Sequence, residues 1–181
     1  EKTSESNEVL KKKIDSGDSE RVPMSRLRAV VASRLLESQI QTASLTTFNE
    51  VDLFEVKKLR EKYKDSFEKK YGVKLGFMGL FLKASSIALQ EMPIVNASIE
   101  GTDIVYHGFQ DIGVAVSSDR GLVVPVIRDV LNMSIAEIEN SIKTFSSKAR
   151  DGKLSIEDMT GGTFTVSNGG VFGSLLSLSL I

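Results

Sequence analysis

The sequence predicts an α/β or α+β fold in which helices cover a mixed sheet. Segments with helical periodicity are interleaved with short segments rich in β-branched residues, without a regular strand–helix–strand rhythm and without an internal repeat. The length of 181 residues fits one domain. Apolar residues make up 41% and charged residues 26%, so a sizeable core is expected.

The first part of the chain is expected to contain a linker, a helix and a strand. Residues 1–20 are rich in charge and poor in apolar side chains, which is typical of a flexible linker. Ser25 is placed to cap a helix that runs to about Thr42. Residues 45–52 then have the threonine and β-branched content of a strand.

Two further helices are expected before the main sheet. Asp52 and Glu55 have the spacing of a capping box, and Gly72 suits the end of the helix that they begin. Residues 77–89 are apolar nearly all round, so this helix is expected to be buried on most sides. Pro93 is expected to end it.

The second half of the chain supplies most of the expected strands. Residues 96–106 have the pattern of a hairpin, and residues 112–116 alternate as a strand. Residues 122–127 form a further strand, in which Pro125 indicates an edge or a bulge. The last expected strand covers residues 163–166, followed by a turn.

The helix between these strands is expected to begin at a second capping box. Ser134 and Glu137 have the required spacing, and the helix is expected to end near Gly152. Periodicity then predicts which side chains form the core. They are Phe81, Ile87, Val114, Val116, Ile138 and Ile142.

Composition excludes several classes of function. The 23 basic and 24 acidic residues nearly cancel, which argues against a nucleic-acid or anionic-lipid partner. The absence of cysteine and the single histidine exclude disulfides, thiolate sites and a histidine cluster, so no metal is expected. No apolar run reaches the roughly 18 residues of a membrane span. The bacterial cytoplasm or the mitochondrial matrix is therefore the expected location.

Two features invite a functional interpretation and also have a structural one. His107 is of the residue type that most often acts as a general base, but no Asp or Ser spacing implies a relay, which favours a structural or surface role. The glycine-rich residues 161–170 lack the Lys-Ser/Thr of a phosphate-binding loop and the spacing of a dinucleotide fingerprint. Tight turns around one strand explain those glycines equally well.

Several motifs together resemble the acyltransferase domain of 2-oxo-acid dehydrogenase complexes. They are VPMSRLR (22–28), NASI (96–99), RGLVVPVIR (120–128), DGKL (151–154) and GGTFTVSNGGVFG (161–173). A further motif, LTTFNEV (45–51), is similar to the succinyl-transferring branch. The resemblance implies a fold like that of chloramphenicol acetyltransferase, with residues 1–20 as linker and residues 21–181 as catalytic domain.

The resemblance also implies an activity and partners. The family reaction here would move a succinyl group between dihydrolipoamide and coenzyme A in the 2-oxoglutarate dehydrogenase complex of the tricarboxylic acid cycle. Family members form homotrimers, with active sites between subunits, that assemble into a larger core. Its partners would be 2-oxoglutarate dehydrogenase, dihydrolipoamide dehydrogenase and a separate lipoyl domain.

The motifs assign roles to particular residues. Ser167 matches the hydroxyl that donates to the tetrahedral oxyanion, with Asn168 beside it, although Ser167 alone could be a turn residue bonded to its own backbone. Arg28 matches an arginine that pairs with the aspartate next to the catalytic histidine. The residues implied in substrate binding are Thr46, Thr47 and Phe48, whose hydroxyl pair can hydrogen-bond the distal carboxylate of a succinyl group.

The sequence departs from the family at its C-terminal end. The family's catalytic histidine lies in an Asp-His-Arg-x-x-Asp-Gly motif that these 181 residues do not contain, and residues 178–181 differ from the family continuation. His107 lies outside the matching catalytic motif. We therefore expect a C-terminally truncated acyltransferase domain that is inactive on its own. The alternative is a non-catalytic assembly module of the same complex.

Overall fold

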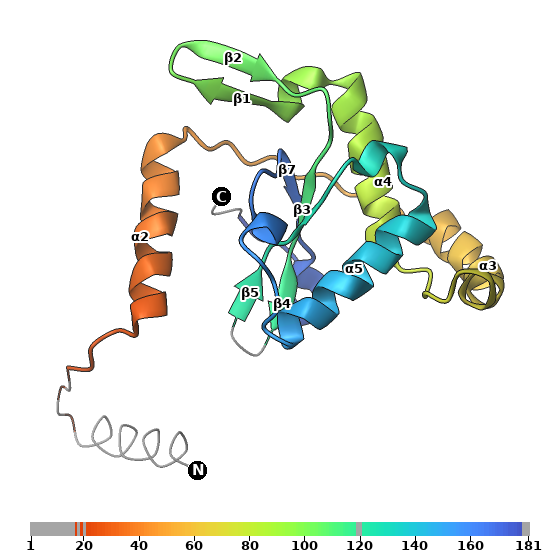
Figure 1. The fold of residues 1–181 in the computed structure, drawn as a ribbon, viewed down its shortest axis with the longest axis horizontal. Helices are drawn as coiled ribbons and strands as arrows, with labels where there is room; N and C mark the ends of the chain where they lie inside the picture. Colours follow the sequence, from red (N-terminus) through yellow and green to blue (C-terminus); the bar gives the residue numbers. More distant parts are fainter. Residues whose placement is uncertain (1–16, 18, 20, 119–120, 179–181) are drawn as a thin grey trace. The chain divides into compact units, whose positions relative to one another are not determined.

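The computed structural model describes residues 17, 19, 21–118 and 121–178 (Figure 1). The chain divides into two compact units. The first unit comprises residues 1–49 and 176–181, and the second comprises residues 50–175. The linker expected over residues 1–20 lies almost wholly outside the described residues.

The first unit contains helix α2, Arg26–Gln41, as predicted. It begins where the hydroxyl of Ser25 accepts a hydrogen bond from the backbone N–H of Arg28 at 3.4 Å. The strand predicted over residues 45–52 is wrong, because this segment has no regular secondary structure. A strand needs an adjacent strand to satisfy its backbone groups, and none of the described strands pairs with it.

The second unit opens with helix α3, Phe54–Tyr71. The carboxylate of Asp52 accepts from the N–H of Phe54 at 2.8 Å, whereas Glu55 pairs with Lys58 at 3.2 Å. The predicted capping box is therefore wrong: the N-cap residue is Leu53, and only the one bond from Asp52 replaces the box. The predicted stop at Gly72 is confirmed, since this residue adopts the left-handed conformation with φ of 69°.

Helix α4, Phe77–Glu91, is buried along one face only. That face is formed by Gly79, Leu82, Ser86 and Leu89. The prediction that Phe81 and Ile87 lie in the core is wrong, because their side chains are 42% and 43% exposed. The described part of the chain covers only one side of this helix, and an all-round apolar composition does not specify which side that is.

Pro93 ends α4 as predicted and begins the short helix η1, Pro93–Asn96. The predicted hairpin follows, with β1, Ala97–Glu100, antiparallel to β2, Asp103–Tyr106. It forms a two-stranded sheet of its own.

The central sheet of the second unit has the order β6-β3-β7 and is mixed, as predicted. Strand β3, Ile112–Val114, is antiparallel to β6, Val126–Ile127, and parallel to β7, Phe164–Val166. A separate pair joins β4, Val116–Ser118, to β5, Gly121–Val123.

The single strand predicted over residues 122–127 is wrong, because Pro125 divides it. Proline lacks the N–H that a continuous strand would donate. The carbonyl of Pro125 still accepts from the N–H of Val114 at 2.9 Å, so the break stays attached to β3. The interruption therefore separates β5, which lies in one sheet, from β6, which lies in another.

Helix α5, Ile135–Arg150, begins at the predicted capping box. The hydroxyl of Ser134 accepts from the N–H of Glu137 at 3.3 Å, and the Glu137 carboxylate accepts from the N–H of Ser134 at 2.7 Å. The Ser134 hydroxyl also donates to that carboxylate at 2.7 Å, and this bond, together with the one from the Ser134 N–H, lowers the pKa of Glu137. Short helices η2, η3 and η4 cover Val130–Asn132, Glu157–Met159 and Gly169–Phe172.

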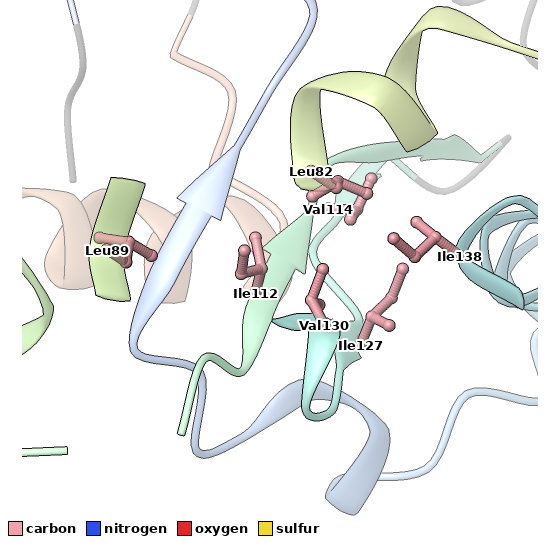
Figure 2. Close-up of a cluster of buried hydrophobic side chains, with 7 residues drawn as sticks. All are labelled: Leu82, Leu89, Ile112, Val114, Ile127, Val130 and Ile138. Carbon is pink, nitrogen blue, oxygen red and sulfur yellow. The ribbon is translucent and has the colours of Figure 1, made fainter. Parts of the chain in front are cut away.

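The core lies where α4 and α5 pack on the sheet (Figure 2). Its buried members are Leu82, Leu89, Ile112, Val114, Ile127, Val130 and Ile138. The core positions of Val114 and Ile138 are thus confirmed. Ile142 is partly buried against the cluster, whereas Val116 is half-buried in β4 and is not part of it.

A buried carboxylate joins α5 to the start of α4. Glu139 is 8% exposed and accepts from the N–H of Gly79 at 2.8 Å. Burial raises the pKa of Glu139, against the lowering effect of the backbone N–H groups of Gly79 and Gly76 and of the Arg60 charge. A Cβ at Gly79 would stand 2.6 Å from the Glu139 Oε1 atom, so any larger residue there would displace this carboxylate.

Candidate active-site residues

Ser167 lies directly after β7, at the carboxyl end of that strand. The preceding peptide is fixed, because the carbonyl of Val166 accepts from the N–H of Ala115 at 3.1 Å. The Ser167 side chain is exposed. Within the described residues, no hydrogen bond to its hydroxyl is found. The group therefore remains able to donate to a bound molecule.

Asn168 forms the turn that follows. Its Oδ1 atom accepts from the N–H of Gly170 at 3.0 Å and caps the short helix η4. The turn-stabilising role considered for Ser167 is thus performed by Asn168. Ser167 and Asn168 thus lie together in the turn between β7 and η4, within the second unit.

The other candidates belong to the first unit. Arg28 lies in the first turn of α2 and is exposed, and no side-chain bond from its guanidinium is found among the described residues. Thr46, Thr47 and Phe48 lie in the irregular segment after that helix. All three are exposed, with the Phe48 side chain at 52%.

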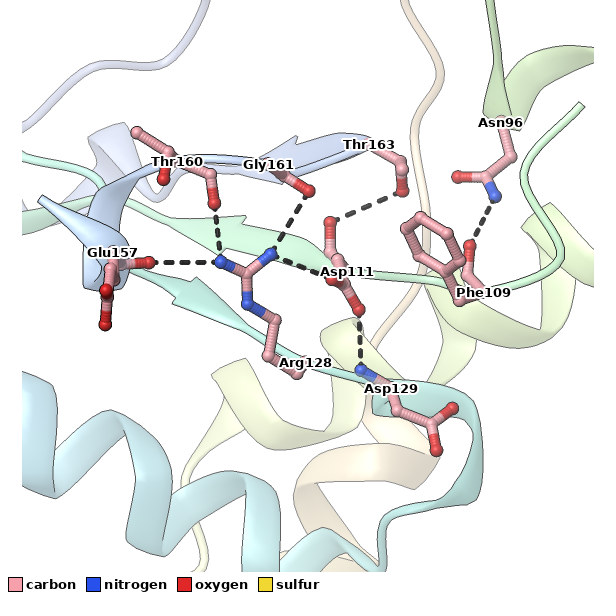
Figure 3. Close-up of polar contacts among 9 residues, drawn as sticks. All are labelled: Asn96, Phe109, Asp111, Arg128, Asp129, Glu157, Thr160, Gly161 and Thr163. Atoms are coloured by element: carbon pink, nitrogen blue, oxygen red, sulfur yellow. Dashed lines mark hydrogen bonds and ion pairs between the residues drawn. The ribbon is translucent and has the colours of Figure 1, made fainter. Parts of the chain in front are cut away.

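The start of β7 is held by a polar cluster that sequence reasoning missed (Figure 3). Arg128 donates to the carbonyls of Glu157, Thr160 and Gly161 and forms an ion pair with Asp111. These residues are separated by 17 to 33 positions from Arg128. In the sequence, only the position of Arg128 at the end of the RGLVVPVIR motif pointed to this cluster, and nothing indicated which residues it would bind.

His107 makes a contact that its sequence position did not suggest. Its Nε2 atom lies 3.0 Å from the hydroxyl of Ser98, and its ring lies 5.5 Å from that of Phe109. The hairpin brings Ser98 close, since its register pairs Ser98 with Val105. In the described part of the chain no carboxylate bonds to this imidazole, so the contact ties the two strands together without forming a relay.

Two hollows of the second unit lie away from Ser167. One, of about 340 Å³, is lined by residues that include Gly72, Lys74, Glu139 and Lys143. The other, of about 330 Å³, includes Pro93, His107 and Gln110. Neither is lined by Ser167 or Asn168.

The residues that the structure describes contain no group of three His, Asp or Glu side chains placed to hold a metal ion. None of their helices is both long and apolar enough to cross a membrane.

A family model for the catalytic domain of 2-oxoacid dehydrogenase acyltransferases matches residues 16–181. The dihydrolipoyllysine-residue succinyltransferase component of the 2-oxoglutarate dehydrogenase complex from Pseudomonas aeruginosa is 67% identical over 162 residues, which is 89% of this chain and 40% of that protein. The component of the same name from Haemophilus influenzae is 52% identical over all 181 residues. The chain spans about two fifths of the length of these relatives.

Solved structures share the fold. A probable dihydrolipoamide acetyltransferase from Listeria monocytogenes has a TM-score of 0.84 at 37% identity, covering 92% of this chain and 70% of that one. A dihydrolipoamide acetyltransferase from Azotobacter vinelandii, studied for catalytic roles of a serine, a histidine and an asparagine, has a TM-score of 0.78 at 35% identity, covering 84% and 63%. These likenesses confirm the expected acyltransferase fold.

Proposed function

The chain belongs to the family of 2-oxoacid dehydrogenase acyltransferase catalytic domains, and from this premise we propose that it serves succinyl transfer between dihydrolipoamide and coenzyme A. The observation that carries the proposal is the 67% identity to a succinyltransferase component of a 2-oxoglutarate dehydrogenase complex. Identity to the acetyltransferases of known structure is lower, at 35% and 37%. This difference in identity supports succinyl rather than acetyl as the transferred group.

Ser167 is the oxyanion donor in this proposal. When the thiolate of one thiol attacks the thioester carbonyl, a carbon–sulfur bond forms and the carbonyl oxygen becomes an oxyanion. The Ser167 hydroxyl donates a hydrogen bond to that oxygen. The carbonyl then re-forms as the original carbon–sulfur bond of the thioester breaks, and the electrons of that bond leave with the departing thiolate. One such donor is worth about 3–4 kcal/mol. The exposed hydroxyl, without a partner in the described residues, supports the role.

The remaining candidate residues have separate roles in this proposal. Asn168 holds the turn that carries Ser167, through its bond to the N–H of Gly170. Arg28 pairs with a carboxylate outside these 181 residues and orients the loop that supplies the base. The succinyl carboxylate is bound near three exposed residues. These are Thr46, Thr47 and Phe48.

These 181 residues taken alone do not catalyse the transfer. The Asp-His-Arg-x-x-Asp-Gly motif does not occur in them, and the imidazole of His107 is bonded to Ser98 at 3.0 Å. A thiol of ordinary pKa near 8.5 is only a few per cent ionised at neutral pH, and a general base contributes about 10²–10⁴-fold. The alternative role of the chain is that of an assembly module of the same complex.

The proposal includes a cellular setting. Residues 21–181 belong to a catalytic domain and residues 1–20 to a linker. The domain forms homotrimers within a larger core. The solved cubic core of a pyruvate dehydrogenase complex, which is 36% identical to this chain, supports this assembly. Partners are the 2-oxoglutarate dehydrogenase and dihydrolipoamide dehydrogenase components and a lipoyl domain. The named relatives are bacterial, which supports a bacterial cytoplasm.

An acyl-transfer assay tests the function and the missing base together. The 181 residues and a version extended through Asp-His-Arg-x-x-Asp-Gly are each given coenzyme A with succinyl- or acetyl-dihydrolipoamide. The extended version is expected to prefer succinyl, and the 181 residues are expected to be silent. Acetyl transfer at least as fast as succinyl would overturn the donor assignment. Equal rates for the two polypeptides would show that another base acts, with His107 the first residue to replace.

A further inference from the structure

Arg128 lies just beyond β6 and binds the segment that leads into β7 (Figure 3). Its guanidinium donates to the carbonyl oxygens of Glu157 at 3.1 Å, Thr160 at 2.6 Å and Gly161 at 3.2 Å. The same group pairs with the Asp111 carboxylate at 2.9 Å. One side chain therefore binds three carbonyl groups between the start of η3 and the residues before β7.

Asp111 connects this cluster to the central strand. It directly precedes β3, and its side chain is only 13% exposed. One carboxylate oxygen pairs with Arg128, and the other accepts from the N–H of Asp129 at 2.8 Å. The Asp111 carbonyl accepts from the N–H of Thr163 at 2.8 Å. One polar cluster thus joins three strand termini at the same end of the sheet: the end of β6, the start of β3 and the start of β7.

This cluster lies at the start of a very short strand. Strand β7 has three residues, which pair with the three residues of β3. A slip of one residue turns every side chain of a strand to the opposite face. Since Ser167 directly follows β7, the direction of its hydroxyl depends on that register.

We infer that Arg128 is a positioning residue for Ser167, because it fixes the register of β7 from the end of the strand opposite to that serine. The inference rests on the proposed function for the role of Ser167, whereas the effect of Arg128 on register does not. Arg128 touches neither substrate nor reacting atoms in this scheme.

The site is built for a guanidinium in particular. Gly161 has φ of 78°, and a Cβ there would stand 3.1 Å from the Arg128 Nη1 atom. Arginine offers five donors in a planar fork, whereas lysine offers three from a single point. Lysine in place of Arg128 can keep the ion pair with Asp111 but cannot reproduce all three carbonyl bonds.

Amide hydrogen exchange in the 181-residue chain tests the register. The variants are Arg128→Ala and Arg128→Lys, with Ser134→Ala as a control that removes a helix cap elsewhere. Exchange at the amides of Ala115 and Thr163, which bond across the β3–β7 pair, is compared with exchange at Met92 at the end of α4. Arg128→Lys is expected to accelerate the first two at least about tenfold more than the third, and Arg128→Ala further still.

The control separates positioning from general loss of stability. Ser134→Ala is expected to alter the three amides alike. If the Arg128 variants also alter all three alike, or leave Ala115 and Thr163 unchanged, the inference is overturned. Should Arg128→Ala not fold, Arg128→Lys alone decides the matter.

The second measurement is the rate of succinyl transfer by the version extended through Asp-His-Arg-x-x-Asp-Gly. Arg128→Lys is expected to lower kcat about 10–100-fold with KM within twofold of the unaltered protein, since small displacements at a reacting centre have effects of that size. Faster exchange with unchanged kcat would overturn the link to Ser167. If the unaltered extended protein transfers no succinyl group, the proposed function fails, while the exchange measurement still decides whether Arg128 fixes the strand.

Discussion

Leu82 and Phe81 are neighbours on α4 with opposite environments, and their replacement by alanine gives a sharp test of the fold. Leu82 is fully buried in the core cluster, whereas Phe81 is 42% exposed. Side-chain size alone would rank Phe81 as the more important. The structure predicts the reverse order.

The magnitudes follow from burial. Leu82→Ala removes three carbons worth about 0.8 kcal/mol each, or about 2.4 kcal/mol, and the cavity that remains raises the total to about 3–5 kcal/mol. A fully buried phenylalanine is worth about 1.5–3 kcal/mol relative to an exposed one, so Phe81→Ala is expected to cost about 1–2 kcal/mol.

Urea unfolding followed by circular dichroism measures both variants. Ile138→Val, which deletes one methyl group from another fully buried side chain, calibrates the scale at about 0.5–1.5 kcal/mol and remains measurable if Leu82→Ala does not fold. A loss from Phe81→Ala equal to or larger than that from Leu82→Ala would refute the assignment of the buried face of α4.

Three further changes test separate features. Gly113→Ala would place a Cβ 2.9 Å from Val124 Cγ1 and 3.1 Å from Thr165 Oγ1, so a loss of about 1–3 kcal/mol is expected in urea unfolding, and a neutral result would contradict this packing. Burial raises the pKa of Glu139, so its contribution to stability falls as the pH rises from the ordinary glutamate pKa through the raised folded one. Glu139→Gln should remove this loss of unfolding free energy at higher pH. An identical pH dependence of unfolding for the two proteins would contradict the expectation. Ser134→Ala should lower stability by about 1 kcal/mol through loss of the helix cap, whereas an unchanged urea midpoint would argue against the cap.

Features determined by a few neighbouring residues could be predicted from the sequence. The capping box at Ser134 and Glu137 and the stop at Gly72 depend on backbone groups within a single turn. The hairpin over residues 96–106 follows from alternation around a turn. In each case the partners lie within a few residues of one another, so local pattern carries the information.

Features determined by distant neighbours could not be predicted. The apolar residues of α4 surround the helix, and only the contacts made by Leu82 and Leu89 decide which face is buried. The place of Ser167 at the end of a strand followed from the sequence, because strand and turn signals adjoin it. The role of Arg128 did not, since its partners come from two other segments that meet only in the folded sheet.

The oxyanion role of Ser167 is tested most directly by replacing this residue in the version extended through Asp-His-Arg-x-x-Asp-Gly and measuring succinyl transfer to coenzyme A. Ser167→Ala is expected to lower kcat about 10²–10³-fold, as for loss of one oxyanion donor, with little change in KM. Ser167→Thr, which keeps a hydroxyl, is expected to retain more activity than Ser167→Ala. A kcat for Ser167→Ala within a few-fold of the unaltered enzyme would contradict the account.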